Sequence, residues 1–220
     1  MNRTRPTTVV WNYDRVEIIA DAVIHALGIA FGIAAAAVLL AISFDAAHRS
    51  DIVPVVIYII GLLSMLGLSA AYNLWPVSPR KWLLRRFDHS SIYLLIAATY
   101  TPLIWHAKGG LPAALLIVIW LTAAAGIVLK LGWPERFDRL SIVLFLLLGW
   151  SGVLAYGPMV TELPPLTLWL IAIGGVLYSA GVPFHLWERL RFHTAIWHGF
   201  VLTAAVTHCL AIVSSLMLPV

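Results

Sequence analysis

Four short stretches of the sequence carry carboxyl, imidazole, hydroxyl or amide side chains, and in three of them the residues are four apart, as on one side of a helix. They are Glu17, Asp21 and His25, at four-residue intervals; Ser69 and Asn73; Asp88 and His89; and Thr194 and His198. Carboxylates and imidazoles transfer protons or bind metal ions when they are brought together. Residues four apart lie above one another on a helix, so each group can face a common neighbour. What they do depends on the elements that position them.

The chain as a whole is too apolar to be a soluble domain. Of its 220 residues, 61% are hydrophobic and 11% are charged, whereas soluble domains carry about 25% charged residues. We therefore interpret it as an integral membrane protein. Its net charge of +4 requires no nucleic acid as a partner, because membrane topology and anionic lipids account for the basic residues.

Seven apolar stretches are long enough to span or nearly span a bilayer core, which takes about 20 helical residues. Their continuous apolar character predicts helices and not barrel strands, so the fold class is an all-α bundle of seven transmembrane helices. The predicted spans are Ile18–Ile42, Ile52–Leu74, His89–Trp105, Leu111–Leu129, Leu140–Tyr156, Leu166–Trp187 and Ala195–Met217. We expect residues 1–17 to form a cytoplasmic N-terminal segment without the pattern of a cleaved signal peptide, and residues 18–217 to form the transmembrane domain.

The distribution of basic residues predicts the orientation of the helices, because cytoplasmic loops are enriched in Lys and Arg. With the N-terminus in the cytoplasm, twelve of the fourteen basic residues lie on the inner side, and only Arg49 and Lys108 lie outside. The sequence therefore predicts a cytoplasmic N-terminus and an outer C-terminus. We expect a multi-pass protein of the bacterial inner (plasma) membrane.

In this orientation all four polar stretches lie in the inner half of the bilayer. Ionisable residues inside a membrane are rare and mark functional sites by default, so we predict a polar site that faces the cytoplasm. For Asp88 an alternative is an N-cap at the start of the third helix. His208 lies ten residues beyond His198, about 15 Å deeper along the helix. It is either a structural hydrogen-bonding residue or part of a cavity.

Three of these stretches also resemble a known family. The segment SAAYNLWPVSPRKWLLRRFDHSSIYLLIAATYTP, residues 69–102, looks like the hemolysin III family, the bacterial branch of the progestin and adipoQ receptor superfamily. The segment EIIADAVIHALG at residues 17–28 is similar to the first-helix motif of that family, and TAIWHGFVLTAAVTHCLAI at residues 194–212 is similar to its last. The seven-helix, N-in architecture of the family agrees with the topology predicted from charge.

The resemblance implies a zinc site on the cytoplasmic side. In family members a Ser-x-x-x-His on helix two, an Asp at the start of helix three and a His-x-x-x-His on helix seven meet there. The three histidines bind zinc, and the Asp orients a zinc-bound water. Carried over, the serine is Ser69, the aspartate is Asp88 and the last histidine is His198, which makes Ser69 and Asp88 the candidate catalytic residues. Asn73 and Thr194 stand at the other two histidine positions, and neither is a good zinc ligand.

Three outcomes follow for this site. Loss of the metal would leave a hydrogen-bonded polar cluster. A rearranged metal site would combine His198 with one of four residues, namely Asp88, His193, His25 or His89. A harder, oxygen-preferring ion would bind Asp88, Asn73 and Asp21.

We favour loss or weakening of zinc binding, with Asp88 and His198 still paired, because two ionisable groups at one membrane depth are more stable together. We expect Asp88 to face the polar site and His89 to face a neighbouring helix or the headgroups. Further members of the polar site are Glu17, Asp21, His25, Asn73, Thr194 and His208.

Three functions remain open. A role in membrane lipid homeostasis, or in sensing a lipid or small-molecule ligand, fits the altered ligand set best. A zinc-dependent intramembrane hydrolase of lipid amides or esters is the alternative, since the wider superfamily includes ceramidase-like enzymes. A pore-forming cytolysin is the third, although a pore needs polar residues along several spans, and the fourth to sixth spans carry almost no charge. Membrane lipids are the expected partners, and the sequence leaves the oligomeric state open.

Overall fold

Helices make up most of the computed structural model, which describes residues 13–133, 138–155, 157 and 161–218. These residues form seven α-helices and two 3-10 helices, and they contain no strand. The α-helices are α1 (Arg15–Ser43), α2 (Ile52–Leu74), α3 (Pro79–Ile104), α4 (Gly110–Gly132), α5 (Asp138–Trp150), α7 (Pro165–Leu186) and α8 (His193–Met217); the 3-10 helices are η1 (Ala46–Asp51) and η2 (Ser151–Ala155). The prediction of an all-α, seven-helix fold is confirmed.

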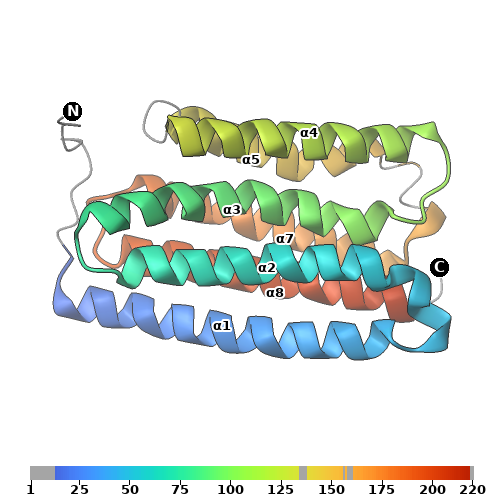
Figure 1. Cartoon of the computed structure of the whole chain (residues 1–220), viewed down its shortest axis with the longest axis horizontal. Coiled ribbons are helices and arrows are strands. Elements are labelled where there is room, and N and C mark those ends of the chain that lie inside the picture. The colour runs from blue at the N-terminus through green and yellow to red at the C-terminus, as the bar shows by residue number, and fades with distance from the viewer. Residues whose placement is uncertain (1–12, 134–137, 156, 158–160, 219–220) are drawn as a thin grey trace.

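The helices lie side by side in one bundle, with α1 at one edge and α4 with α5 at the opposite edge (Figure 1). α1 packs against α2 and α8, α3 packs between α2 and α4, and α7 packs along α8. α5 makes lighter contacts with α3, α4 and α7. Because α1 and α8 are neighbours, the first and last motifs of the sequence come together, and residues 177 positions apart form hydrogen bonds.

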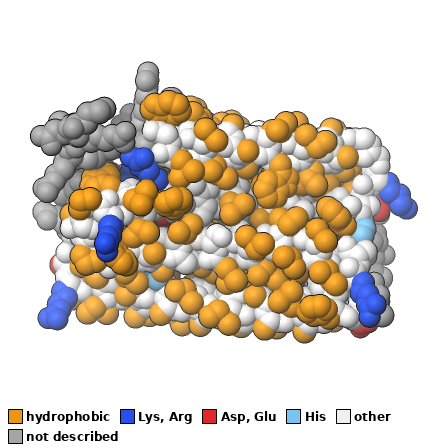
Figure 2. Space-filling view, in the orientation of Figure 1, with side chains coloured by type: hydrophobic (Ala, Val, Ile, Leu, Met, Phe, Trp, Pro, Cys, Tyr) orange, Lys and Arg blue, Asp and Glu red, His pale blue; other side chains and the backbone are white. Residues whose placement is uncertain are grey.

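The outer surface of the bundle is apolar over most of its length. Five helices are long and apolar enough to cross a membrane, namely α1, α2 with the end of η1, α4, α7 and α8. A shorter apolar helical stretch, Leu140–Leu154, belongs to α5 and η2. Figure 2 shows hydrophobic side chains along the whole visible face, with Lys and Arg near its two ends. This is the surface of an integral membrane protein with several membrane-spanning helices.

The third helix starts ten residues before its predicted beginning at His89. Ser78 is the N-cap, its hydroxyl accepts from the N–H of Lys81, and Pro79 is the first helical residue. Serine followed by proline is a favoured helix start. Asp88 is therefore inside the helix, and the N-cap alternative is wrong. Hydropathy marks only the apolar part of this helix, since its first third is basic.

The predicted fifth span extends further along the chain than the α-helix that the structure contains there. α5 ends at Trp150 and η2 continues the chain to Ala155, whereas the sequence predicted one span to Tyr156, which lies outside the described residues. At the change of helix type, the Tyr100 hydroxyl accepts from the N–H of Gly152 and donates to the carbonyl oxygen of Gly149. These bonds link the end of α5 to α3.

Candidate functional site

Acidic residues at the start of α1 fasten this helix to the start of α8. Asp14 is the N-cap of α1, and its Oδ2 accepts from Nη2 of Arg191 at 2.9 Å. The backbone N–H of Glu17, with smaller contributions from Arg191, lowers the pKa of Asp14. Glu17 accepts from Asp14 N–H through Oε2 and from Phe192 N–H through Oε1, both at 2.9 Å. Phe192 has a left-handed backbone (φ 62°), which non-glycine residues rarely adopt. Glu17 therefore positions α8.

One turn further along α1, Asp21 lies between two histidines. Its Oδ1 is 2.6 Å from Nδ1 of His198 on α8, and its Oδ2 is 3.4 Å from Nε2 of His25. The two imidazole rings are 4.5 Å apart between centroids, and all three residues are buried. One metal-ligating atom from each lies within 4.8 Å of the other two. We call these three residues the Asp–His–His cluster.

One nitrogen of this cluster lacks a hydrogen bond. Nε2 of His25 is buried and has no hydrogen-bond partner among the residues that the structure describes. Asp21 is close enough for an ion pair with it, but the contact at 3.4 Å does not have the direction of a hydrogen bond. Buried polar atoms of native proteins normally have a partner, so this nitrogen is a candidate ligand atom.

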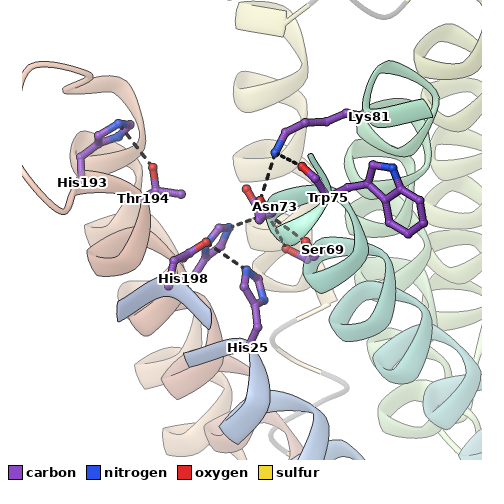
Figure 3. Close-up of polar contacts among 9 residues, drawn as sticks. His25, Ser69, Asn73, Trp75, Lys81, His193, Thr194 and His198 are labelled. Carbon is purple, nitrogen blue, oxygen red and sulfur yellow. Dashed lines mark hydrogen bonds and ion pairs between the residues drawn. The ribbon is translucent and has the colours of Figure 1, made fainter. Parts of the chain in front are cut away.

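Asp21 also determines how His198 is oriented. An ionised carboxylate only accepts hydrogen bonds, so Nδ1 of His198 carries the proton in the 2.6 Å contact. In the neutral imidazole, Nε2 is then an acceptor, and it lies 3.5 Å from Nδ2 of Asn73 on α2. Asn73 in turn donates to the carbonyl oxygen of Ser69 at 2.9 Å. Figure 3 shows His25, His198, Asn73 and Ser69 gathered at one place between three helices.

Lys81 covers this place from the first turn of α3. Its Nζ donates to the carbonyl oxygens of Asn73 and Trp75, at 3.0 and 2.8 Å, and so satisfies the free carbonyls at the end of α2 (Figure 3). Burial lowers the pKa of Lys81, and the Asp21 carboxylate acts in the opposite direction. The Lys81 ammonium group therefore binds the end of α2 and also interacts electrostatically with the Asp21 carboxylate of the cluster.

Two small cavities adjoin the cluster. The first has a volume of about 40 Å³, and its lining includes Glu17, Asp21, Asn73, Lys81 and Thr194. The second has a volume of about 20 Å³ and lies one turn deeper, where its lining includes His25, Gly28, Ser69, His198 and Leu202. Each is large enough for at least one water molecule, which needs roughly 10–15 Å³. The cluster is therefore accessible to a small ligand atom on two sides.

Asp88 lies close to the cluster without being its carboxylate. The side chain of Ser69 lies beside the Asp88 carboxyl group, and the carboxylate that pairs with His198 belongs to Asp21. The predicted pairing of Asp88 with His198 is therefore wrong. The reason is the packing order: α1 packs against α8, whereas α3, which carries Asp88, packs mainly against α2 and α4.

Other predicted residues lie outside the cluster. Nδ1 of His89 is 3.9 Å from Asp138 of α5, so the expectation that His89 faces a neighbouring helix is confirmed. His193 and Thr194 contact each other, with 3.4 Å between Nε2 and Oγ1. Figure 3 shows both at the start of α8, with the Thr194 hydroxyl turned toward His193.

His208 is a structural residue of the α7–α8 contact. Its Nε2 lies 3.2 Å from the carbonyl oxygen of Ile171, and its ring packs beside Tyr178. Gly174 makes room for this ring, because a Cβ at that position would lie 2.2 Å from it. Of the two alternatives for His208, the structure supports the structural hydrogen bond.

The cluster offers a metal two imidazoles and one carboxylate in place of the three histidines that the resemblance implies. Zinc binds such sets in tetrahedral geometry with bonds of about 2.0–2.1 Å, so that neighbouring ligand atoms are about 3.4 Å apart. The Asp21–His25 separation of 3.4 Å has this value. The Asp21–His198 contact of 2.6 Å is shorter and is typical of a carboxylate that orients a metal-binding histidine. These residues fit zinc, with Asp21 as the third ligand or as the orienting group.

Comparison with known proteins agrees with this arrangement of motifs. The family model described as "Haemolysin-III related" matches residues 16–209. The chain belongs to the haemolysin III family. It is similar to a "Hemolysin-3 homolog" of Bacillus subtilis (strain 168), with 37% identity over 88% of this chain and 92% of that protein, and to "Hemolysin-3" of Bacillus cereus, with 35% identity over 84% and 85%. It is also 31% identical to the human "Monocyte to macrophage differentiation factor", over 96% of this chain and 90% of that protein. No solved structure matches.

Sequence reasoning had included Asp21 and His25 in the polar site but had assigned the carboxylate of the site to Asp88. The signal for the correct choice was present, because Asp21 and His25 are four residues apart inside the first-helix motif of the haemolysin III family. A second charged group, around Asp138 and Lys130, was missed altogether. Arg85 and Lys130 were considered only among the basic residues that predict the topology.

Proposed function

We propose that this haemolysin III protein binds a divalent transition metal ion, zinc first, at Asp21, His25 and His198, and that the site serves membrane lipid homeostasis or lipid sensing. The observation that carries the proposal is the convergence of three buried ligand atoms within 4.8 Å. Leaving a buried polar atom such as Nε2 of His25 without a partner costs about 1–3 kcal/mol. A metal–ligand bond removes that cost.

The chain's own residues have separate tasks in this site. His25 and His198 supply the neutral nitrogens. Asp21 supplies the negative charge that a dication requires, and it holds the imidazole of His198 in place through Nδ1. When bound, the metal supplies a Lewis acid toward a carbonyl or phosphoryl oxygen. The two cavities beside the cluster support access for a polar atom of a lipid headgroup or of a small ligand.

Elemental analysis of the detergent-purified protein tests the metal site. We expect close to one zinc per chain in the wild type and little in His25→Ala and His198→Ala. His106→Ala is the matched control, because it also removes an imidazole paired with an aspartate, Asp51, but near the opposite end of the bundle. Wild-type protein without metal, or equal metal in all four proteins, would refute the proposal.

Hydrolysis of lipid amides or esters is the second candidate, and one observation favours it. The side chains of Asp88 and Ser69 lie side by side, and Ser69 lines the deeper cavity together with His25 and His198. If the site is catalytic, Asp88→Asn will retain zinc and lose hydrolysis of a lipid amide. Absence of hydrolysis in zinc-loaded wild-type protein leaves the sensing role.

Pore formation has less support. Thr99 and Thr101, which are deeper polar residues of α3, donate to the carbonyl oxygens of Leu95 and Ala97 in their own helix. Both hydroxyl groups therefore donate their protons within α3, and this does not favour a polar pathway through the bundle.

A further inference from the structure

A second group of charged residues lies at the same end of the bundle as the Asp–His–His cluster, where α3, α4 and α5 meet. Asp138, the first residue of α5, accepts from Nη2 of Arg85 through Oδ2 and from Nζ of Lys130 through Oδ1, both at 2.6 Å. Nδ1 of His89 is 3.9 Å from the same Oδ1. We call Arg85, Lys130 and Asp138 the Arg–Lys–Asp cluster.

The charges of this cluster do not balance. Two cations, Arg85 and Lys130, face one carboxylate, and they are buried, with side-chain exposures of 8% and 2%. Lysine and arginine are rarely buried unless they are paired, and here one anion serves both. The Arg85 guanidinium also lies over the ring of Trp82, 6.0 Å away, and it interacts electrostatically with Asp88, one turn along α3, although the ion pair of Arg85 is with Asp138.

The hydrogen bonds of Arg85 are incomplete as well. While Nη2 binds Asp138, Nη1 is buried and has no acceptor among the residues that the structure describes. A buried donor that belongs to a charged group is costly when it lacks a partner. A single anion could supply both the missing negative charge and the acceptor for Nη1 of Arg85.

We propose that the Arg–Lys–Asp cluster binds a phosphate group, supplied by the headgroup of an anionic phospholipid. A guanidinium presents two parallel N–H donors that match phosphate oxygens, and this is the preferred geometry of arginine–phosphate contacts. Asp138 is the most exposed member of the cluster, with 36% of its side chain exposed. The cluster lies where α3 begins and α4 ends, at the end of the bundle that the charge distribution assigns to the cytoplasm, and anionic lipids are enriched in that leaflet.

Lipid binding to detergent-purified protein tests the proposal by native mass spectrometry and by thermal stability. The probes are phosphatidylglycerol, zwitterionic phosphatidylcholine at equal concentration, and inorganic phosphate. The critical variant is Arg85→Lys, which keeps the charge and one bond to Asp138 but removes the second N–H donor group. Arg86→Lys is the matched control. It is the same substitution at the next residue of α3, but the Arg86 guanidinium donates to the carbonyl oxygen of Leu131 and is not part of the Arg–Lys–Asp cluster. One charge-assisted hydrogen bond corresponds to about a tenfold change in affinity.

We expect phosphatidylglycerol to bind and to stabilise the wild type, phosphatidylcholine to do neither, and Arg85→Lys to weaken phosphatidylglycerol binding about tenfold relative to Arg86→Lys. Should Arg85→Lys fail to fold, Lys130→Gln replaces it with the same expected direction. Equal binding of the two lipids, or equal loss in Arg85→Lys and Arg86→Lys, overturns the proposal. If inorganic phosphate stabilises the protein and phosphatidylglycerol does not, the cluster binds free phosphate, and the proposal that it binds a lipid headgroup is overturned.

One internal alternative is decided by the same assay. Glu135, in the chain between α4 and α5, lies outside the described residues and carries a carboxylate. If it were the missing acceptor, Glu135→Gln would lower thermal stability without lipid, and phosphatidylglycerol would add nothing to the wild type. If the phosphate is the acceptor, Glu135→Gln retains the wild-type response to phosphatidylglycerol.

Discussion

Replacement of Asp21 by asparagine is the sharpest test of the Asp–His–His cluster. The change keeps the shape of the side chain and removes its charge, and it affects both contacts at once, 2.6 Å to Nδ1 of His198 and 3.4 Å to Nε2 of His25. If Asp21 orients His198, loss of the carboxylate weakens metal binding by about 10–100-fold. If Asp21 is itself a ligand, the loss is larger, because a neutral amide is a poor substitute for a carboxylate at zinc.

Thermal or denaturant unfolding with added zinc measures this loss. At a zinc concentration 100 times the wild-type Kd, a site that binds only the folded protein stabilises it by about 2.7 kcal/mol. By the same relation, a tenfold weaker variant gains about 1.4 kcal/mol and a hundredfold weaker one about 0.4 kcal/mol. Unfolding in excess chelator gives the effect of the substitution on the fold alone, which is subtracted.

Asp51→Asn is the matched control for this experiment. It is the same isosteric change in a buried aspartate that also pairs with a histidine, His106, but Asp51 is the last residue of η1, away from the Asp–His–His cluster. We expect its zinc-dependent stabilisation to equal that of the wild type. The reasoning is refuted if Asp21→Asn retains the full zinc response, or if Asp51→Asn loses as much of it.

Three further predictions concern the zinc site, the contact between α7 and α8, and the topology of the chain. Asn73→His will raise zinc affinity, because Nε2 of His198 lies 3.5 Å from the side chain it replaces; unchanged affinity in a chelator competition would mean that this nitrogen is not available. Gly174→Ala will destabilise the protein by about 1–3 kcal/mol through overpacking, since its Cβ would lie 2.2 Å from the His208 ring; adding the substitution His208→Ala should relieve the clash, and persistent loss of stability would contradict this account. A reporter fused to the C-terminus will be active on the outer side of the membrane, and a cytoplasmic signal would reverse the assignment of both clusters to the inner leaflet.

Much of the fold could be predicted because a membrane restricts the alternatives. Backbone groups in a bilayer must be satisfied internally, so long apolar stretches imply helices, and the predicted second span, Ile52–Leu74, coincides with α2. The boundaries were less predictable where the helix is not apolar. Hydropathy does not detect the basic first third of α3, although Ser78 and Pro79 are a recognisable helix start.

The sequence predicted which residues belong to the candidate site but not which of them pair with one another. Spacing put Asp21 and His25 on one side of the first helix, the topology predicted from charge put Asp88 and His198 at the same depth, and the resemblance implied that these two meet. Neither reveals which helix packs against which, so the choice between Asp21 and Asp88 as the partner of His198 was open. The sequence analysis favoured Asp88, whereas the structure pairs His198 with Asp21.

The sequence by itself therefore determined the class of protein, its seven helices and its family, because these depend on composition, periodicity and local motifs. Only the tertiary structure decided which residues form a site. The packing of α1 against α8 brings Asp21 to His198, and the meeting of α3, α4 and α5 brings Arg85 and Lys130 to Asp138. The physical reason is that helical periodicity specifies the direction of a side chain around its own axis. The neighbour that it meets depends on how all the helices pack.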